Sequence, residues 1–154
     1  MSAAFRFVSY KVDQLALNMR PSMLMLTKPY FDEVWDIKIG MRIPQYFRKS
    51  NSYLAGLDVT MTYPPMEGED SKEPSITVTA GVMGLFEAQE GRFPIEVEEK
   101  IVRSHLPTLV MPYLRAAVTS ALANCGVGIH ILPLFNLHEI ASETLKDEKI
   151  IVLD

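Results

Sequence analysis

The hydrophobic pattern of the chain changes once, near Pro94, and this change constrains the fold more than any other feature. Before Pro94, apolar side chains recur at every second position in several runs, which is the period of a half-buried β-strand. After Pro94 they recur at helical spacing, and the first helical turns carry glutamates, which the helix dipole favours there. A chain in which strands precede helices is predicted to belong to the α+β class.

Four stretches are predicted to form strands. Residues 35–43 (WDIKIGMRI) alternate most regularly, and residues 53–63 and 76–88 follow the same rule on either side of an acidic, turn-rich loop at 67–74. Residues 5–17 alternate with a slip of phase, which predicts a β-bulge. Because the connections are short and polar, neighbouring strands are predicted to pair antiparallel. The expected sheet has four antiparallel strands.

Two helices are predicted after the change of period, and both pack on one face of the sheet. The first follows Pro94 and is interrupted at residues 105–107, because a residue that precedes proline is disfavoured in the α region. The second begins between Thr108 and Pro112 and ends at Gly126, a residue type that commonly follows a helix.

Small residues line one side of the second predicted helix. Ala116, Ser120 and Asn124 recur every four residues, opposite a bulkier apolar stripe. The bulky stripe can cover the sheet, and the small side can accept another helix, from the same chain or from a partner subunit. A short amphipathic helix is predicted after Asn136, an acceptable N-cap. Residues 1–154 are predicted to form one domain.

Composition argues against several classes of function. The net charge is −4, and the fifteen lysines and arginines are scattered, so nucleic-acid binding is not expected. A single cysteine cannot form an internal disulfide and fits a reducing compartment. No apolar run approaches the length of about 18 residues that a membrane span needs. A soluble, cytoplasmic protein without membrane insertion is expected.

The common motifs of enzymes and metal sites are missing from the sequence. It contains no HExxH, CxxC, GxSxG, GxxxxGK[ST] or GxGxxG. Glu96, Glu98 and Glu99 form either a carboxylate site or, as we favour, the solvated start of a helix. We therefore expect no catalytic residue, no metal and no cofactor, and an enzyme is the least favoured interpretation.

Aromatic and large apolar residues are more prominent than any catalytic pattern. Met83 and Leu85 even occupy what should be the polar face of their strand. A groove or sheet edge lined in this way can bind apolar segments of other chains, although core packing remains the alternative for each residue. The candidate binding residues are Tyr46, Phe47, Met83, Leu85, Phe86 and Phe135.

The order of three segments resembles the SecB family of protein-export chaperones. These segments are GLFEA at 84–88, LPTLVMPYLRAAVTSALANCG at 106–126 and LPLFNLHEI at 132–140, and FRFVSYKVDQLALNM at 5–19 resembles the family's first strand. Met111 stands where the family has phenylalanine, and the closing motif is shifted by one residue. The matching positions are Gly84, Phe86, Pro107, Pro112, Tyr113, Arg115, Pro133 and Asn136.

The resemblance implies a specific fold, assembly and activity. The implied fold is a four-stranded antiparallel sheet with a long helix, assembled as a homotetramer, a dimer of dimers, in which Ala116, Ser120 and Asn124 pack against another subunit. The implied activity is that of an ATP-independent holdase, which binds unfolded polypeptides or export precursors and passes them to the SecA translocase. Which acidic residues would meet SecA, among Asp13, Asp58 and Glu87, is left open.

A second hypothesis belongs to another functional class. SecB-like proteins also occur as chaperones of antitoxins, so the same fold can serve as an adaptor dedicated to one partner. A general holdase is expected to bind several unrelated unfolded proteins and none of their native forms. An adaptor is expected to recognise one folded or partly folded partner, and its binding is expected to be insensitive to unfolding.

Overall fold

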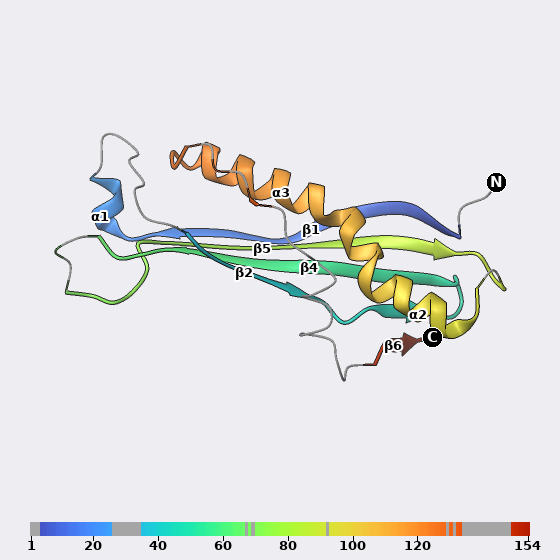
Figure 1. Ribbon diagram of the computed structural model, residues 1–154. Coiled ribbons are helices and arrows are strands. Elements are labelled where there is room, and N and C mark those ends of the chain that lie inside the picture. Colours follow the sequence, from blue (N-terminus) through green and yellow to red (C-terminus); the bar gives the residue numbers. More distant parts are fainter. Residues whose placement is uncertain are drawn as a thin grey trace.

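The computed structural model describes most of the chain, and Figure 1 shows how its elements are arranged. Phe135 and the helix predicted after Asn136 lie outside the described residues. The described residues are 4–25, 35–66, 68, 70–91, 93–128, 130, 132–133 and 149–154.

A mixed sheet forms one layer of the molecule. Its strand order is β1-β5-β4-β3-β6, and β2 pairs with β4 beside β3. Among the described residues the sheet has six strands, and the prediction of four was wrong because the two extra strands have three residues each. We expected a wholly antiparallel sheet, but the β3–β6 pair is parallel. The strands are β1 (Phe5–Met19), β2 (Asp36–Met41), β3 (Gln45–Phe47), β4 (Ser52–Tyr63), β5 (Ile76–Ala88) and β6 (Ile151–Leu153).

The predicted bulge lies in β1. The register of β1 against β5 shifts between Phe7 and Ser9 and again between Val12 and Gln14. Each shift inserts one extra residue into β1, which explains the slip of phase in the sequence. The second shift leaves Asp13 as the extra residue, and its carboxylate reaches across the sheet to Arg42.

Three helices are described: α1 (Pro21–Leu24), α2 (Ile95–Ser104) and α3 (Leu106–Asn124). The break between α2 and α3 is confined to His105, so the later start predicted for α3 was wrong. Pro107 lies in the first turn of α3, where a backbone N–H is not needed. Pro112 lies inside α3 and provides no N–H for the carbonyl of Thr108. The chain from α2 through α3 turns a corner over the sheet (Figure 1).

The core lies between α3 and the face of the sheet that α3 covers. Leu114, Val118 and Leu122 of the predicted bulky stripe are buried there, against the alternate residues of β4 and β5. Cys125, which was predicted to belong to the same stripe, is exposed after the end of α3. A Cβ at Gly84 would lie 2.5 Å from Cγ1 of Val110, so glycine at this position lets α3 approach β5 closely. The side chains of α3 that are buried completely or nearly so are Leu106, Val110, Leu114, Val118 and Leu122.

Two of the residues that carried the sequence resemblance, Tyr113 and Arg115, make contacts from the middle of α3. The ring of Tyr113 stacks on Tyr10 of β1, with a centroid distance of 3.8 Å. Nε of Arg115 donates a hydrogen bond of 3.0 Å to the carbonyl of Leu132, which precedes Pro133. The helix therefore joins the first strand to the segment that follows the helix.

Candidate functional site

A row of large side chains crosses the sheet on the face that α3 covers. The backbone register places Val152 of β6 opposite Tyr46 of β3, Tyr46 opposite Tyr53 of β4, Tyr53 opposite Phe86 of β5, and Phe86 opposite Phe7 of β1. The rings of Tyr46 and Tyr53 are 4.7 Å apart, and those of Phe7 and Phe86 are 5.4 Å apart. Phe86 is completely buried, whereas Phe7 is 37% exposed and Val152 is 49% exposed. We call these five residues the aromatic row, although Val152 at one end is aliphatic. The row is buried in its middle and exposed to solvent at both ends.

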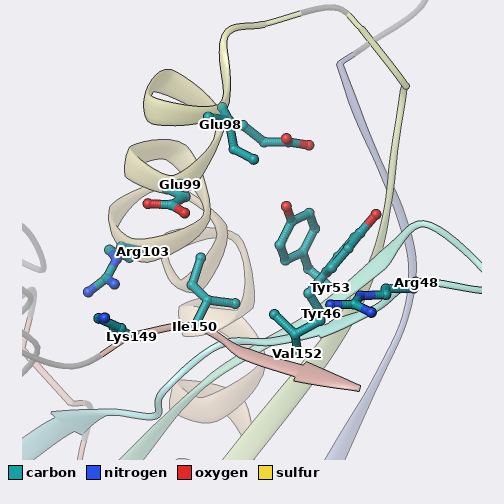
Figure 2. Close-up of a pocket in the computed structure, with 10 residues that line it drawn as sticks. Tyr46, Arg48, Tyr53, Glu98, Glu99, Arg103, Lys149, Ile150 and Val152 are labelled. Atoms are coloured by element: carbon teal, nitrogen blue, oxygen red, sulfur yellow. The ribbon is translucent and has the colours of Figure 1, made fainter. Parts of the chain in front are cut away.

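A cavity of about 500 Å³ opens at the Tyr46 end of the aromatic row. Its walls come from three parts of the chain that are distant in sequence: α2, the β3–β4 hairpin and the segment that contains β6. Figure 2 shows the two tyrosine rings facing α2 across the cavity, with Ile150 between them and the helix. The lining residues are Tyr46, Arg48, Tyr53, Ile95, Glu98, Glu99, Arg103, Lys149, Ile150 and Val152.

The β3–β4 turn fixes the position of Tyr46. Its hydroxyl donates a hydrogen bond of 2.8 Å to Oδ1 of Asn51. Nδ2 of Asn51 donates in turn to the carbonyl of Ala88, also at 2.8 Å. Asn51 has a φ of 49°, a left-handed conformation that asparagine tolerates better than most residues. The tyrosine floor of the cavity is therefore anchored to the end of β5.

Burial raises the pKa of two groups in the cavity wall. The pKa of Glu98 is raised first by burial and then by the neighbouring charge of Glu99. The pKa of Tyr53 is raised chiefly by burial and further by the charge of Glu98. The cavity thus combines a partly buried aromatic floor with a charged rim. Such a site suits an apolar side chain whose own backbone remains near the polar rim.

The predicted binding residues divide between the two faces of the sheet. Tyr46 lines the cavity, but Phe86 belongs to the core and has no exposed surface for a ligand. Met83 and Leu85 are half-buried on the face opposite α3, because they alternate with residues that face the helix. Phe47 points to that opposite face as well, since it alternates with Tyr46. The structure therefore does not bring the candidates together as one patch.

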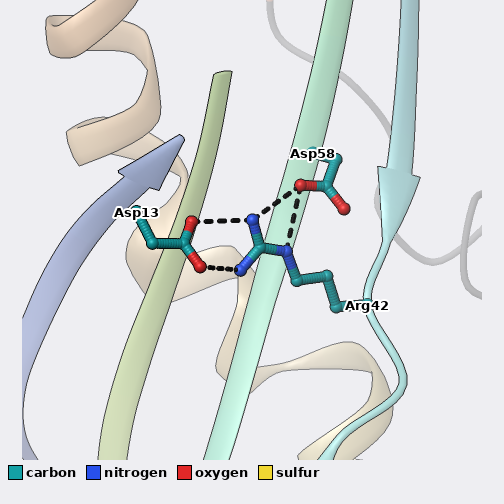
Figure 3. A network of polar contacts seen from close by, with 3 residues as sticks. All are labelled: Asp13, Arg42 and Asp58. Atoms are coloured by element: carbon teal, nitrogen blue, oxygen red, sulfur yellow. Dashed lines mark hydrogen bonds and ion pairs between the residues drawn. The ribbon is translucent and has the colours of Figure 1, made fainter. Parts of the chain in front are cut away.

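An ion-pair network lies on the face opposite α3 (Figure 3). The guanidinium of Arg42 donates hydrogen bonds to Asp13 of β1 and to Asp58 of β4, including one of 2.7 Å to each. It lies over Gly81 of β5, where a Cβ would collide with it. The hydrogen bond from Arg42 lowers the pKa of Asp13, and the two carboxylates raise the pKa of Arg42. The arginine therefore joins β1 and β4 across β5.

Several residues of the site were not among the predicted candidates. Tyr53 and Ile95 line the cavity beside Tyr46. Val152 reaches it from β6, which has three residues and is too short to show a period, and Ile150 directly precedes that strand. Phe7 at the other end of the row could have been found, because it belongs to an alternating segment.

Two features are absent from the described part of the chain. No three or more histidine, cysteine, aspartate or glutamate side chains are grouped so that they could hold a metal ion. No described helix is both long and apolar enough to cross a membrane.

A mixed sheet covered on one face by a bent pair of helices is the SecB-like α+β fold, as the sequence resemblance implied. The structure is similar to that of a SecB-like chaperone from Mycobacterium tuberculosis, solved in complex with a ChAD peptide from the HigA1 antitoxin. The TM-score is 0.65, the identity is 10%, and the match covers 86% of this chain and 91% of that chain. The sequence matches no protein-family model and no curated protein.

Proposed function

We propose that this protein is an ATP-independent chaperone of the cytoplasm that binds unfolded polypeptides or export precursors as extended segments. The observation that carries the proposal is the cavity at the exposed end of the aromatic row, on a SecB-like fold. Tyr46, Tyr53 and Ile95 would contact an apolar client side chain, while the charged rim stays near the client backbone.

The proposed activity needs no catalytic group. A holdase acts by mass action, because it binds the unfolded state of a client and not its native state. Native proteins bury their large apolar side chains, whereas unfolded chains expose them. An open cavity with an aromatic floor therefore selects unfolded chains without nucleotide or cofactor.

The direct test is capture of clients that are unrelated to one another. Two slow-folding proteins are diluted from denaturant with an equimolar amount of this protein, without nucleotide, and aggregation is followed by light scattering. A holdase suppresses the aggregation of both and binds neither native form. Failure with both clients would contradict the holdase proposal.

A dedicated adaptor, such as an antitoxin-specific chaperone, is the second candidate function. In the holdase proposal, captured clients are handed to SecA through an acidic sheet surface. Asp13 and Asp58, however, are both paired with Arg42, and Glu87 is paired with Arg6 at 2.6 Å. These arginines offset the negative charge that would attract a basic surface of SecA. This pairing counts against handover to SecA, and the antitoxin peptide bound by the similar M. tuberculosis chaperone supports the adaptor as the second candidate.

The two candidates differ in the partners that they select. The adaptor is expected to bind a single polypeptide and to leave both slow-folding proteins unprotected. Handover to SecA is tested by co-sedimentation of SecA with the client-loaded protein. Retention of SecA would support the export function, and capture of clients without SecA would leave a holdase that does not serve the translocase.

We also propose that the chain assembles as a homotetramer, a dimer of dimers, through α3. Ala116, Ser120 and Asn124 are exposed on the side of α3 that faces away from the sheet. Leu109, which is 53% exposed, adds apolar surface to the exposed part of α3. Small side chains allow the backbone of a second helix to come close, so this side of α3 suits contact with another subunit.

Phe47, Met83, Leu85 and Phe135 stay predictions as client contacts. Met83 and Leu85 are half-buried side chains on the face of the sheet opposite α3, whereas the cavity lies on the face that α3 covers. Substituting Leu85 with aspartate tests this face separately from the cavity. Weaker client capture by a folded Leu85→Asp protein would add the face to the binding surface.

A further inference from the structure

We propose that residues 149–154 occupy the client site in cis, and that the site recognises extended segments running parallel to β3 with apolar side chains two residues apart. This inference rests on the proposed function, because it names the kind of polypeptide that the cavity takes. The observation behind it is that a segment of this chain already lies along β3 with its side chains in the cavity.

Backbone pairing holds this segment against β3. Val152 lies opposite Tyr46 in the parallel register, and the pairing is three residues long. At its two ends, the N–H of Ile151 donates to the carbonyl of Pro44 and the N–H of Arg48 donates to the carbonyl of Leu153, each at 3.0 Å. An extended client that displaced β6 could make the same backbone bonds, whatever its sequence.

Side-chain alternation supplies the selectivity. Ile150 and Val152 line the cavity, and Figure 2 shows both on the cavity side of the segment, near the tyrosine rings. Ile151 and Leu153 are not in the cavity lining, because successive residues of a strand point to opposite sides. Two apolar side chains separated by one residue of any kind therefore fill the site.

An exposed ion pair lies at the far end of the segment. The carboxylate of Asp154 lies 3.5 Å from Nη1 of Arg48, on the rim of the cavity. Asp154 follows Val152 by two positions, so it lies on the same side of the extended segment. The recognised pattern is apolar, any residue, apolar, any residue, acidic.

The segment is held weakly enough to be displaced. It has three paired residues, and the side chains of Ile151, Val152 and Leu153 are 42%, 49% and 37% exposed. Few buried apolar contacts and a short ladder are typical of elements that open locally. A client must compete with this cis segment, so the apparent dissociation constant rises in inverse proportion to the fraction of open sites.

The test compares two substitutions in the full-length chain. Val152→Asp places a carboxylate in the cavity beside Glu98 and Glu99, which disfavours the cis position. Ile151→Asp places the same group one residue away, outside the cavity lining, and serves as the matched control. Circular dichroism first establishes that both variants are folded.

The probe is a fluorescent hexapeptide with the sequence of residues 149–154, KIIVLD. Its binding to each protein is measured by fluorescence anisotropy. If the cis segment fills about nine-tenths of the sites, the Val152→Asp protein binds the probe about tenfold more tightly than the unsubstituted protein. The Ile151→Asp protein is expected to bind like the unsubstituted protein. A probe peptide that itself carries Val152→Asp is expected to bind to none of them.

Two results would overturn the inference: equal affinity of the probe for the Val152→Asp and unsubstituted proteins, or no binding to either. The aggregation assay separates this failure from failure of the proposed function. If the unsubstituted protein protects clients while the probe does not distinguish the variants, the inference that residues 149–154 occupy the site is wrong and the proposed chaperone function stands. If the probe distinguishes the variants and no client is protected, the inference that residues 149–154 occupy the site stands and the proposed holdase function is wrong.

Discussion

Arg42 connects the sheet through its side chain as well as through hydrogen bonds of the backbone. It follows β2 and reaches Asp58 on β4 and Asp13 in the bulge of β1, and 18% of its side chain is exposed. Bidentate, charge-assisted hydrogen bonds of this kind are stronger than exposed single pairs. The bulge in β1 is therefore a position where backbone irregularity serves a specific contact.

Removal of the Arg42 guanidinium should destabilise the fold measurably. Arg42→Met leaves Asp13 and Asp58 without their shared donor, and we expect it to lower the free energy of unfolding by about 1–2 kcal/mol. Arg6→Met breaks an exposed pair with Glu87 and should cost less than about 0.5 kcal/mol. Urea unfolding of both variants measures the difference. Equal losses would mean that Arg42 has no special role.

The lowered pKa of Asp13 predicts how stability changes in acid. The hydrogen bond from Arg42 is the main cause, and the pKa of Asp13 lies below its ordinary value of 3.8. An acid whose pKa falls on folding contributes stability above its unfolded pKa, and this contribution is lost as the pH falls through the folded pKa. Asp13→Asn should therefore lose less stability than the unsubstituted protein between about pH 5 and pH 3. Parallel losses in urea titrations would contradict this assignment.

At the scale of elements, the long alternating strands, the start of α2 and the end of α3 were readable from the sequence. Two features overrode local signals. The break at His105 is a single residue, because Pro107 fits the first turn of α3 and does not delay the helix. Strands β3 and β6 have three residues each, and their pairing depends on contacts between residues about a hundred positions apart. Such pairing leaves no local period in the sequence.

The small side of α3 gives a prediction about assembly. Ser120→Trp introduces a bulky ring on this exposed side, where it would hold a second helix away, whereas Ser120→Ala keeps the side chain small. We expect Ser120→Trp to lower the mass measured by light scattering and Ser120→Ala to leave it unchanged. The fold of the single subunit should survive both changes, because Ser120 is exposed. An unchanged mass for Ser120→Trp would exclude this contact.

At the scale of the whole molecule, the site is assembled from parts that the sequence keeps far apart. The aromatic row draws one residue from each of five strands, and the cavity adds α2 and the segment around β6. Tyr46 was predicted as a binding residue from the sequence. Its neighbours Ile95 and Val152 can be recognised as cavity residues only in the folded structure. The sequence resemblance indicated the class of fold, whereas the position of the cavity depended on the three-dimensional structure.

The most direct test of the central claim is client capture by two variants of α2. Ile95 lines the cavity and is 70% exposed, whereas Val97 is exposed two residues later and is not in the cavity lining. An aspartate at either position lies in the first turn of α2, where the helix dipole favours negative charge, so both variants should fold.

The measurement is the amount of each variant that halves the aggregation of a client diluted from denaturant. We expect Ile95→Asp to need about tenfold more protein than the unsubstituted chain, because the client loses an apolar contact worth about 1–2 kcal/mol. Val97→Asp should need the same amount as the unsubstituted chain. Equal protection by all three proteins would show that clients do not bind in this cavity.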